Sequence, residues 1–335
     1  QSRALRALKA DHRIALTGTP MENHLEELWS IMDFLNPGYL GSLRAFRKNF
    51  VQPVQKSRES KKVDMIRRFV QPFLLRRVKS DRSIIRDLPE KIENKQYCYL
   101  SGEQASLYQN IVNELMRKMR TAKGIERKGL ILASLTRLKQ LCDHPQLILK
   151  NEPELHHSGK LVECFRLLDT LFTKNRNPLV FTQYVKMGHL LQSFIRKKFP
   201  DRAVFFMYGG LPSEKREKLI AEYRKCAPEA IFILSLKTGG LGLNLTEASD
   251  VIHYDRWWNP AVENQATDRA HRIGQHRNVH VHKFISVGTL EERIDEMIER
   301  KKALTDQVIG SGDGWVTEMN DDEVFDLIRL RKKVM

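Results

Sequence analysis

The sequence lacks several features that would place a chain in a membrane or outside the cell. No apolar run approaches the ~20 residues that a membrane-spanning helix needs, and the opening stretch, QSRALRALKADHR, is too polar and basic for a signal peptide. The four cysteines form no C-x-x-C pair and lie far apart, at Cys98, Cys142, Cys164 and Cys226. We therefore expect an intracellular protein with reduced thiols and no metal site.

Acidic residues are scarce relative to basic ones. The chain has 57 Lys and Arg against 41 Asp and Glu, which gives a net charge of +16. Residues 41–86 contain 14 basic and 3 acidic residues, and residues 115–139 contain 8 and 1. Such local excesses are typical of proteins that bind nucleic acid, although a solvated basic surface is the simpler alternative. Membrane-surface binding is disfavoured because the basic stretches lack a face rich in Trp and Phe.

Strand-like and helix-like segments alternate between residues 158 and 310. Apolar runs predict strands at 179–182, 203–208, 230–236, 251–255 and 279–286. This alternation predicts a parallel sheet with helices on both faces. Right-handed crossovers would bring the carboxyl ends of the strands to one edge, where open α/β sheets bind ligands. The segments expected to meet there are Thr182-Gln183, Tyr208-Gly209-Gly210, 238–242 and 256–260.

Glycines and tryptophans are concentrated after two of these strands. Gly239, Gly240 and Gly242 follow the strand at 230–236 and would let the backbone approach a phosphate, unless they serve only a tight turn. Trp257 and Trp258 are adjacent in a polar loop before a proline. We expect one of them in the core and the other free to stack on a base or wedge a duplex.

The stretch QATDRAHRIGQ carries two arginines three residues apart, Arg269 and Arg272. On a helix this spacing places both on one face, together with Gln265. Two guanidinium groups aimed the same way would form a phosphate clamp, because their planar forks match phosphate oxygens. An isolated R-x-x-R pair is more simply a solvated basic face, so the interpretation depends on the surrounding segments.

Those surroundings resemble a known family. The order strand, TGGLGLNL, strand, DRWWNPA and QATDRAHRIGQ is similar to motifs V, Va and VI of the SWI/SNF family of DNA-dependent ATPases, within helicase superfamily two. LTGTPMENHLEELWSIMDFLNPG (16–38) resembles motif III and its following helix, PFLLRRVKSDRSIIRDLPEK (72–91) the linker, and LVFTQY (179–184) motif IV. The resemblance covers nearly the whole chain and is closest to the prokaryotic and recombination-translocase branch.

The resemblance implies an α/β fold with a RecA-like parallel-sheet lobe and helical insertions. It implies these parts: the end of a first RecA-like lobe (1–20), a helical protrusion (21–75), a basic linker (76–91), the start of the second lobe with a helical insertion (92–157), the rest of that lobe with motifs IV to VI (158–310), and a C-terminal packing segment (311–335).

The resemblance also implies roles for individual residues. Arg269 and Arg272 would be arginine fingers, and the nucleotide would be contacted by Gln265, Gly239, Gly240 and Gly242. Contacts to the DNA backbone would come from Thr17, Thr19, Thr182, Gln183, Gly209, Gly210, Lys237, Thr238, Asn244, Trp257, Trp258, Arg76 and Arg77. Thr19 can equally be an ordinary helix N-cap before Pro20.

The chain has no G-x-x-x-x-G-K-[ST] loop. The nearest match ends in Gly159-Lys160, but it has Glu154 in place of the first glycine and Leu161 in place of the hydroxyl. The pairs Asp295-Glu296 and Asp322-Glu323 do not follow an apolar strand, as a Mg²⁺-holding acid should. We therefore expect ATP and Mg²⁺ to be bound mainly by an N-terminal lobe that this chain lacks.

These expectations together describe the C-terminal part of an ATP-driven translocase on double-stranded DNA, inactive by itself. Its partners would be duplex DNA with little sequence preference, the N-terminal lobe, and DNA-bound proteins as cargo. It would work in the cytoplasm or nucleoid of a prokaryote, or in the nucleus of a eukaryote. The alternatives are a non-catalytic DNA-binding or protein-docking module of the same fold, and part of a strand-separating helicase.

Overall fold

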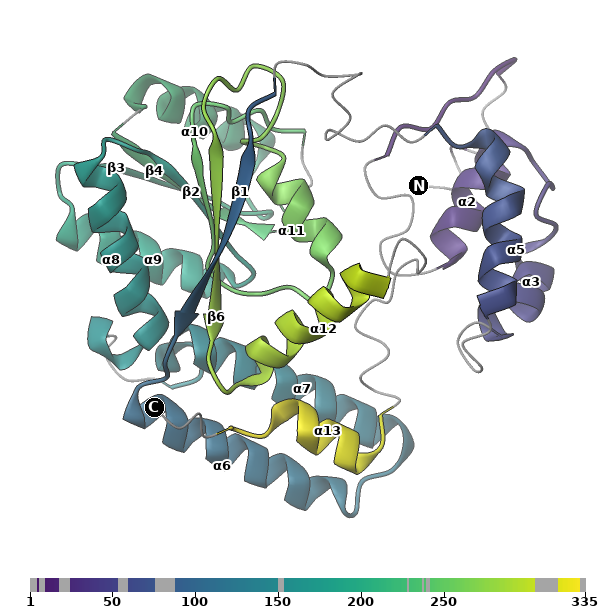
Figure 1. Cartoon of the computed structure of the whole chain (residues 1–335), viewed down its shortest axis with the longest axis horizontal. Coiled ribbons are helices and arrows are strands. Elements are labelled where there is room, and N and C mark those ends of the chain that lie inside the picture. The colour runs from purple at the N-terminus through teal and green to yellow at the C-terminus, as the bar shows by residue number, and fades with distance from the viewer. Residues whose placement is uncertain are drawn as a thin grey trace. The chain divides into compact units, whose positions relative to one another are not determined.

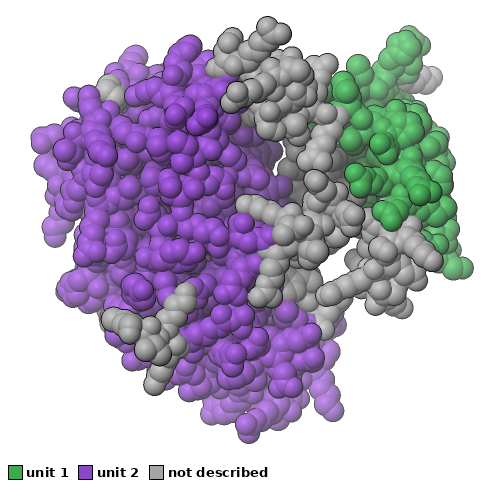
Figure 2. Space-filling model, viewed as in Figure 1, with its two compact units in different colours: residues 1–86, 300–314 green, residues 87–299, 315–335 purple. Residues whose placement is uncertain are grey.

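The computed structural model describes residues 5, 10–17, 25–53, 60–75, 88–149, 154–227, 229–236, 238, 242–304 and 319–331. The chain divides into two compact units (Figure 2). Unit 1 comprises residues 1–86 and 300–314, and unit 2 comprises residues 87–299 and 315–335. Within the described ranges, no helix is long and apolar enough to cross a membrane.

Unit 1 is helical where it is described. Its elements are α2 (Leu25–Leu35), α3 (Leu43–Phe46), a π-helical turn (Arg47–Val51), α5 (Ser60–Val70) and a 3₁₀ turn (Gln71–Phe73). The apolar stripe of α2 packs onto Phe46, Val51 and Ile66, since Leu28, Trp29 and Met32 are all buried. The indole Nε1 of Trp29 donates a hydrogen bond to Gly41 O at 3.0 Å. Unit 1 therefore has a hydrophobic core of its own.

Unit 2 is built on a parallel six-stranded sheet (Figure 1). Its strands are β1 (Lys91–Cys98), β2 (Pro178–Thr182), β3 (Ala203–Met207), β4 (Ala230–Ser235), β5 (Asp250–His253) and β6 (Val279–Ser286). Their order across the sheet is β1-β6-β5-β2-β4-β3. The predicted strands therefore exist, and their predicted pairing as a parallel sheet is confirmed.

Helices cover both faces of this sheet. Successive residues of a strand point to opposite faces, so each buried strand gives apolar side chains to the helices on both sides. Val180 and Ile252 pack with α8 (Gly159–Thr173) and α9 (Val185–Lys198) on one side. Phe181 and Val251 pack with α10 (Ser213–Cys226) and α11 (Pro260–Thr267) on the other. Every residue of β2, β4 and β5 is buried, as strands covered on both faces require.

A helical layer adjoins one end of the sheet. Helices α6 (Gly102–Met119) and α7 (Gly124–Asp143) share a core with α12 (Leu290–Leu304) and α13 (Asp321–Ile328). Helix α6 begins with a capping box: Ser101 Oγ accepts from Gln104 N at 3.1 Å, and Gln104 Oε1 accepts from Ser101 N at 3.0 Å. Figure 1 shows α13 lying against α6 and α7.

Candidate functional site

The loops predicted to meet at one edge of the sheet do so. In the strand register Thr182, the last residue of β2, pairs with Ser235, the last residue of β4. Its neighbour Phe181 pairs with His253, the last residue of β5. The segments that begin at Gln183, Leu236 and Tyr254 therefore leave the sheet side by side, which brings the predicted motif IV next to the loop 256–260, called the Trp-Trp loop below.

A buried carboxylate, Asp255, organises this edge. It accepts hydrogen bonds from Thr182 Oγ1 at 2.6 Å, Gln183 N at 3.0 Å and Gln183 Nε2 at 2.7 Å. Burial raises the pKa of Asp255 above its usual value, against the opposing effects of Lys139 and these hydrogen bonds. The Thr182 hydroxyl is thus enclosed and committed to Asp255. The hydroxyl does not reach the surface of the chain, and the predicted contact of Thr182 with DNA stays a prediction.

Lys139 of α7 lies beside this carboxylate, and its importance was not predicted. Its Nζ donates to Gln183 Oε1 at 2.8 Å. The same nitrogen lies 5.2 Å from the ring centroid of Trp257 and 5.6 Å from that of Trp258, within cation–π range. The sequence held one sign of this role, because Lys139 is a charged residue among the apolar positions Leu135 and Leu138 of its helix.

The two tryptophans are both half-buried, and they pack in different cores. Trp257 lies against the core that contains Phe181 and Val251, and Trp258 against the core of the helical layer. The prediction of one core tryptophan and one free tryptophan is therefore wrong, because the loop runs between two cores and each ring reaches one of them.

Arg256, which directly precedes the two tryptophans, anchors the Trp-Trp loop through buried contacts with two carboxylates. It is buried, with Nε 3.4 Å from Glu263 Oε1 and Nη2 3.1 Å from Asp295 Oδ1. Glu263 Oε1 also accepts a hydrogen bond from Trp257 N at 2.9 Å. The arginine thereby joins the loop to α11 and α12 through charge-assisted contacts.

Arg269 and Arg272 are close together, but they are not on a helix. Helix α11 ends at Thr267, and both arginines lie in the turns that follow it. Arg269 is largely buried and Arg272 is exposed, with Nη1 donating to Leu243 O at 3.3 Å. Burial and then the positive charge of Arg272 lower the pKa of Arg269. The two arginines therefore share a turn, whereas the predicted shared helix face with half-buried Gln265 is wrong.

Gln275 holds the two arginines in this non-helical turn. Its buried Nε2 donates to the carbonyls of Thr246, Ala248 and Ala270 at 3.0, 2.8 and 3.1 Å. Arg269 O accepts from Leu245 N at 2.9 Å. These bonds hold the arginine-bearing turn against residues 245–248, and they replace the helical bonds that a longer α11 would have made. We refer to residues 268–275 as the arginine turn.

The remaining predicted site residues fall into three groups. Gly209, Gly210, Gly242, Asn244 and Thr17 are exposed, the last of them in unit 1. Thr238 is buried, and its hydroxyl donates to Ser235 O at 2.6 Å; its predicted contact with DNA stays a prediction. Outside the described residues lie Thr19, Arg76, Arg77, Lys237, Gly239 and Gly240.

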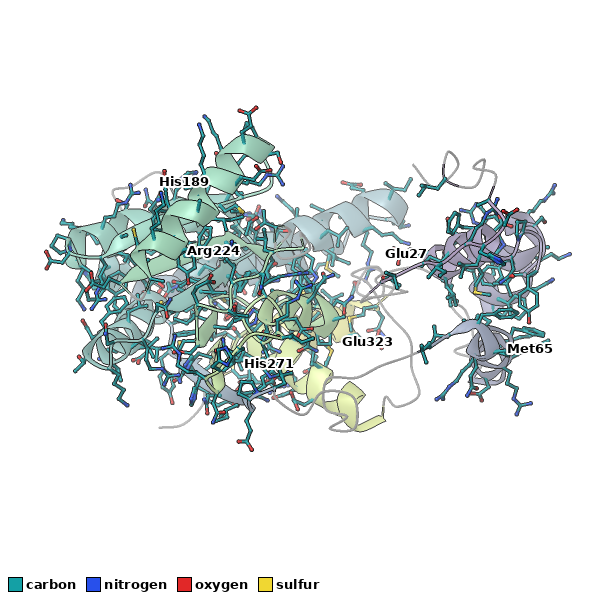
Figure 3. All side chains as sticks on the ribbon, turned by 90° about the horizontal axis from the view of Figure 1, so that it is seen from above. Glu27, Met65, His189, Arg224, His271 and Glu323 are labelled. Atoms are coloured by element: carbon teal, nitrogen blue, oxygen red, sulfur yellow. The ribbon has the colours of Figure 1, made fainter. Side chains whose placement is uncertain are left out.

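Hydrogen bonds to backbone carbonyl groups fix several of the loops that carry these residues. Asn244 O accepts a hydrogen bond from Nη2 of Arg224 at 2.8 Å, and Leu211 N donates to Tyr208 O at 3.1 Å to close the Gly209-Gly210 turn. His271, between the two arginines, contacts Pro89 O through Nε2 at 2.8 Å. Figure 3 labels Arg224 and His271 within unit 2.

The Gly159-Lys160 pair has a structural role. Lys160 is fully buried, and its Nζ donates to Asp143 Oδ1 at 2.9 Å and Glu291 Oε1 at 2.6 Å. Burial opposes its charge, but the two carboxylates outweigh burial and raise the pKa of Lys160. A Cβ on Gly159 would lie 1.8 Å from Tyr99 O, so only glycine fits there. This lysine is therefore not available to a nucleotide.

Comparisons with known proteins agree with this architecture. The model of the SNF2-related domain matches residues 1–147, and that of the helicase conserved C-terminal domain matches residues 160–274. The putative ATP-dependent helicase/translocase YwqA of Bacillus subtilis is 50% identical over 333 residues, covering 98% of this chain and 36% of that protein.

Solved structures from Sulfolobus solfataricus match the fold. The SWI2/SNF2 ATPase core in complex with dsDNA aligns with a TM-score of 0.66 and 43% identity, covering 99% of this chain and 69% of that one. The C-terminal domain of the SWI2/SNF2 ATPase aligns with a TM-score of 0.63 and 39% identity, covering 72% of this chain and 100% of that one.

The parallel sheet with its flanking helices is thus a RecA-like α/β fold of the helicase type. The chain belongs to the SWI2/SNF2 family of ATPases, as its motifs indicated. It spans 36% of the length of the Bacillus subtilis relative and 22% of mouse DNA excision repair protein ERCC-6.

Proposed function

We propose that this chain is the C-terminal part of an ATP-driven translocase on double-stranded DNA, and that its arginine turn completes a nucleotide site on a preceding lobe. The observation that carries the proposal is that Arg269 and Arg272 lie in one turn, whose backbone Gln275 fixes against residues 246–248. Two adjacent guanidinium groups repel each other, so an anionic ligand between them would relieve that repulsion.

The residues present fit part of a Mg-ATP site. The arginine turn offers donors to phosphate oxygens, but the sequence contains no Walker A loop, and Lys160 is enclosed in its own ion network. Mg-ATP would supply the phosphoryl group and its metal from the preceding lobe. Arg269 and Arg272 would then stabilise the negative charge that develops on the phosphoryl oxygens.

Two exposed apolar residues support a missing neighbour for unit 1. Ile14 is 81% exposed and Leu16 is 94% exposed, although both belong to an apolar segment. Because they stand only two residues apart, they offer one apolar surface that a neighbouring domain could cover. We assign the covering surface to the rest of a first RecA-like lobe, which would also hold the nucleotide.

DNA would be contacted mainly through its backbone. In unit 1, Arg44, Arg47 and Lys48 line a surface hollow of about 580 Å³. In unit 2, exposed backbone at Gly209-Gly210 and Gly242 is available for close approach to phosphates. Backbone contacts carry little sequence information, and each phosphate contact adds about −0.9 to the slope of log K against log salt.

Closure of the nucleotide site would be transmitted to these loops through hydrogen bonds. The arginine turn is bonded to residues 245–248, which follow directly on exposed Gly242 and Asn244. A movement of Arg269 toward a phosphate would therefore move the segment that is expected to touch DNA. Cargo on that DNA would be displaced by translocation, in the DNA-containing compartment of the cell.

The decisive test is Arg272→Ala in the full-length protein. Loss of an arginine finger is expected to reduce ATP hydrolysis roughly 10³–10⁵-fold, while duplex DNA affinity is retained. Arg277→Ala is the matched control, because Arg277 is exposed nearby and donates to Glu247 O. If hydrolysis and DNA binding fall together, Arg272 is a DNA contact and the proposal fails.

A further inference from the structure

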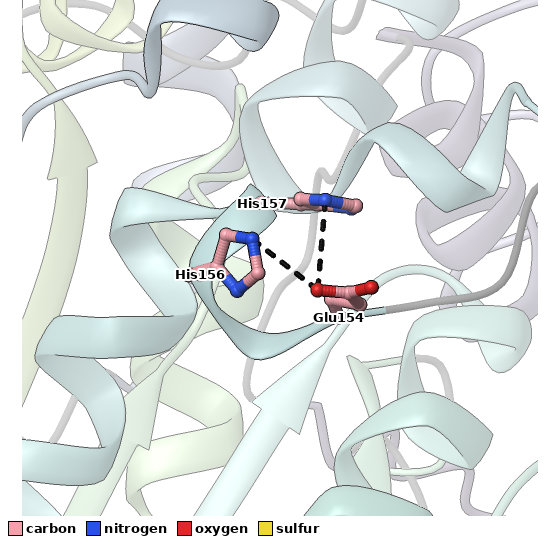
Figure 4. A group of neighbouring side chains, drawn as sticks. All are labelled: Glu154, His156 and His157. Carbon is pink, nitrogen blue, oxygen red and sulfur yellow. Dashed lines mark ion pairs between the residues drawn. The ribbon is translucent and has the colours of Figure 1, made fainter.

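Three potential metal ligands converge just before α8. Glu154 Oε2 lies 3.3 Å from His156 Nε2 and 4.0 Å from His157 Nε2 (Figure 4). The two imidazole rings meet edge to face, with centroids 4.6 Å apart. In the part of the chain that the structure describes, this is the one group of three His, Cys, Asp or Glu side chains with ligand atoms all within 4.8 Å of one another.

The backbone that carries these side chains is fixed from both ends. His144, which is buried, accepts from Gln146 N through Nδ1, so its Nε2 carries the proton and donates to Glu154 O at 3.0 Å. At the other end, Ser101 Oγ donates to His157 O at 3.0 Å. Residues 155–157 form a 3₁₀ turn between these anchors. The ligand-bearing turn is therefore preorganised, and only side-chain torsions remain to be set.

A second carboxylate lies near the other ring nitrogen of His157. Glu103, in the first turn of α6, places Oε2 4.0 Å from His157 Nδ1, whereas Glu154 faces Nε2. The two ring nitrogens of His157 thus face different carboxylates. In zinc proteins the imidazole nitrogen that does not bind the metal commonly donates to a carboxylate, which fixes the tautomer and orients the ring.

We propose that Glu154, His156 and His157 form a zinc-binding site, with Glu103 orienting His157 from α6. Zinc takes imidazole nitrogen and carboxylate oxygen at ~2.0–2.2 Å in tetrahedral geometry, so adjacent ligand atoms lie roughly 3.3–3.5 Å apart. The spacing between Glu154 and His156 already meets this value. His157 Nε2, 4.0 Å from Glu154 Oε2, needs a side-chain shift to reach the same spacing, and a water molecule would fill the fourth position.

The site joins two parts of unit 2 that are distant in sequence. Its ligands precede α8, which packs on the sheet, and Glu103 belongs to α6 of the helical layer. A bound ion would link this layer to the sheet and stabilise their junction, because a ligand that binds only the folded state raises its stability. The site was not visible as a zinc-finger pattern, since it contains no cysteine.

The experiment is calorimetric titration of the tag-free chain with ZnCl₂, followed by thermal unfolding with and without the metal. We expect one equivalent to bind and to raise the melting temperature. His156→Ala and His157→Ala should each weaken binding at least 100-fold, and Glu103→Gln should weaken it roughly 10–100-fold. His189→Ala is the control, because His189 is exposed on α9, among Phe206 and Tyr208 (Figure 3).

Two results would overturn the proposal. One is the absence of zinc binding at 100-fold excess of metal over protein. The other is binding that both histidine variants retain, which would place the ion elsewhere, for instance at the exposed thiol of Cys226. Circular dichroism of each variant checks that the fold is intact, and none of the three substituted side chains belongs to a hydrophobic core.

Discussion

Lys139 donates a hydrogen bond from Nζ to Gln183 Oε1 at 2.8 Å, and this bond joins the helical layer to the carboxyl edge of the sheet. Gln183 in turn donates to Asp255, and the same lysine lies over both rings of the Trp-Trp loop. One buried cation therefore links α7, the loop after β2 and the loop after β5. The candidate DNA-contacting loops are held by this group as well as by the sheet.

Replacing Lys139 by alanine should destabilise unit 2 by about 1–3 kcal/mol, because Gln183 loses its buried partner. The emission of Trp257 and Trp258 should change, since the cation leaves their rings. Urea unfolding followed by tryptophan fluorescence measures both effects. Lys118→Ala is the control: Lys118 pairs with Glu114 on the surface, where such pairs contribute less than about 1 kcal/mol. Equal effects of the two substitutions would refute the role given to Lys139.

Gln275→Ala should loosen the arginine turn. The substitution leaves the carbonyls of Thr246, Ala248 and Ala270 without their side-chain donor, at a cost of about 1–3 kcal/mol. In the full-length protein we expect ATP hydrolysis to fall while DNA affinity changes little, because Arg269 loses its fixed position. His276→Ala, at an exposed neighbouring residue, should leave hydrolysis unchanged. Unimpaired hydrolysis in Gln275→Ala would show that other contacts position the arginines.

The acid stability of unit 2 should depend on Glu93 of β1. Burial opposes the charge of this carboxylate, but hydrogen bonds from Lys283 and Lys91 outweigh it and lower its pKa from 4.5 to about 2. A lowered folded-state pKa contributes stability that is present above pH 4.5 and lost as the pH falls toward 2.

Urea midpoints measured between pH 6 and pH 2 test this dependence. The difference between wild type and Glu93→Gln should shrink as the pH falls from 4.5 to 2. Glu126→Gln, at an exposed acid on α7, should follow wild type throughout. A difference that stays constant with pH would mean that Glu93 stabilises the fold by packing alone.

The sheet could be predicted from the sequence because its strands are local, continuous apolar runs. The strand at 230–236 is an example, since all residues of β4 are buried and its neighbours can be ordered by crossover rules. The arginine pair could also be found, but not its conformation. A spacing of three is compatible with a helix, and nothing local shows that Gln275 and Gly274, at φ +96°, turn the chain there.

The buried side chains that position the site, Asp255 and Lys139, could not be predicted for another reason. Asp255 meets Thr182 from 73 residues away, and Lys139 meets Gln183 from 44 residues away. Such pairs form only after the sheet has brought their loops together, so no local spacing reveals them. Polar residues at apolar positions can be noticed in the sequence, but their partners come from the fold.

We propose that this chain supplies an arginine turn and DNA contacts but does not hydrolyse ATP unaided. The most direct measurement is the DNA-stimulated ATPase activity of the 335-residue chain alone, with duplex DNA and Mg²⁺. We predict no turnover, with duplex DNA binding that weakens steeply as salt rises. Turnover that survives repurification and is lost on Arg269→Ala would contradict the account, because it would require a complete nucleotide site within the chain.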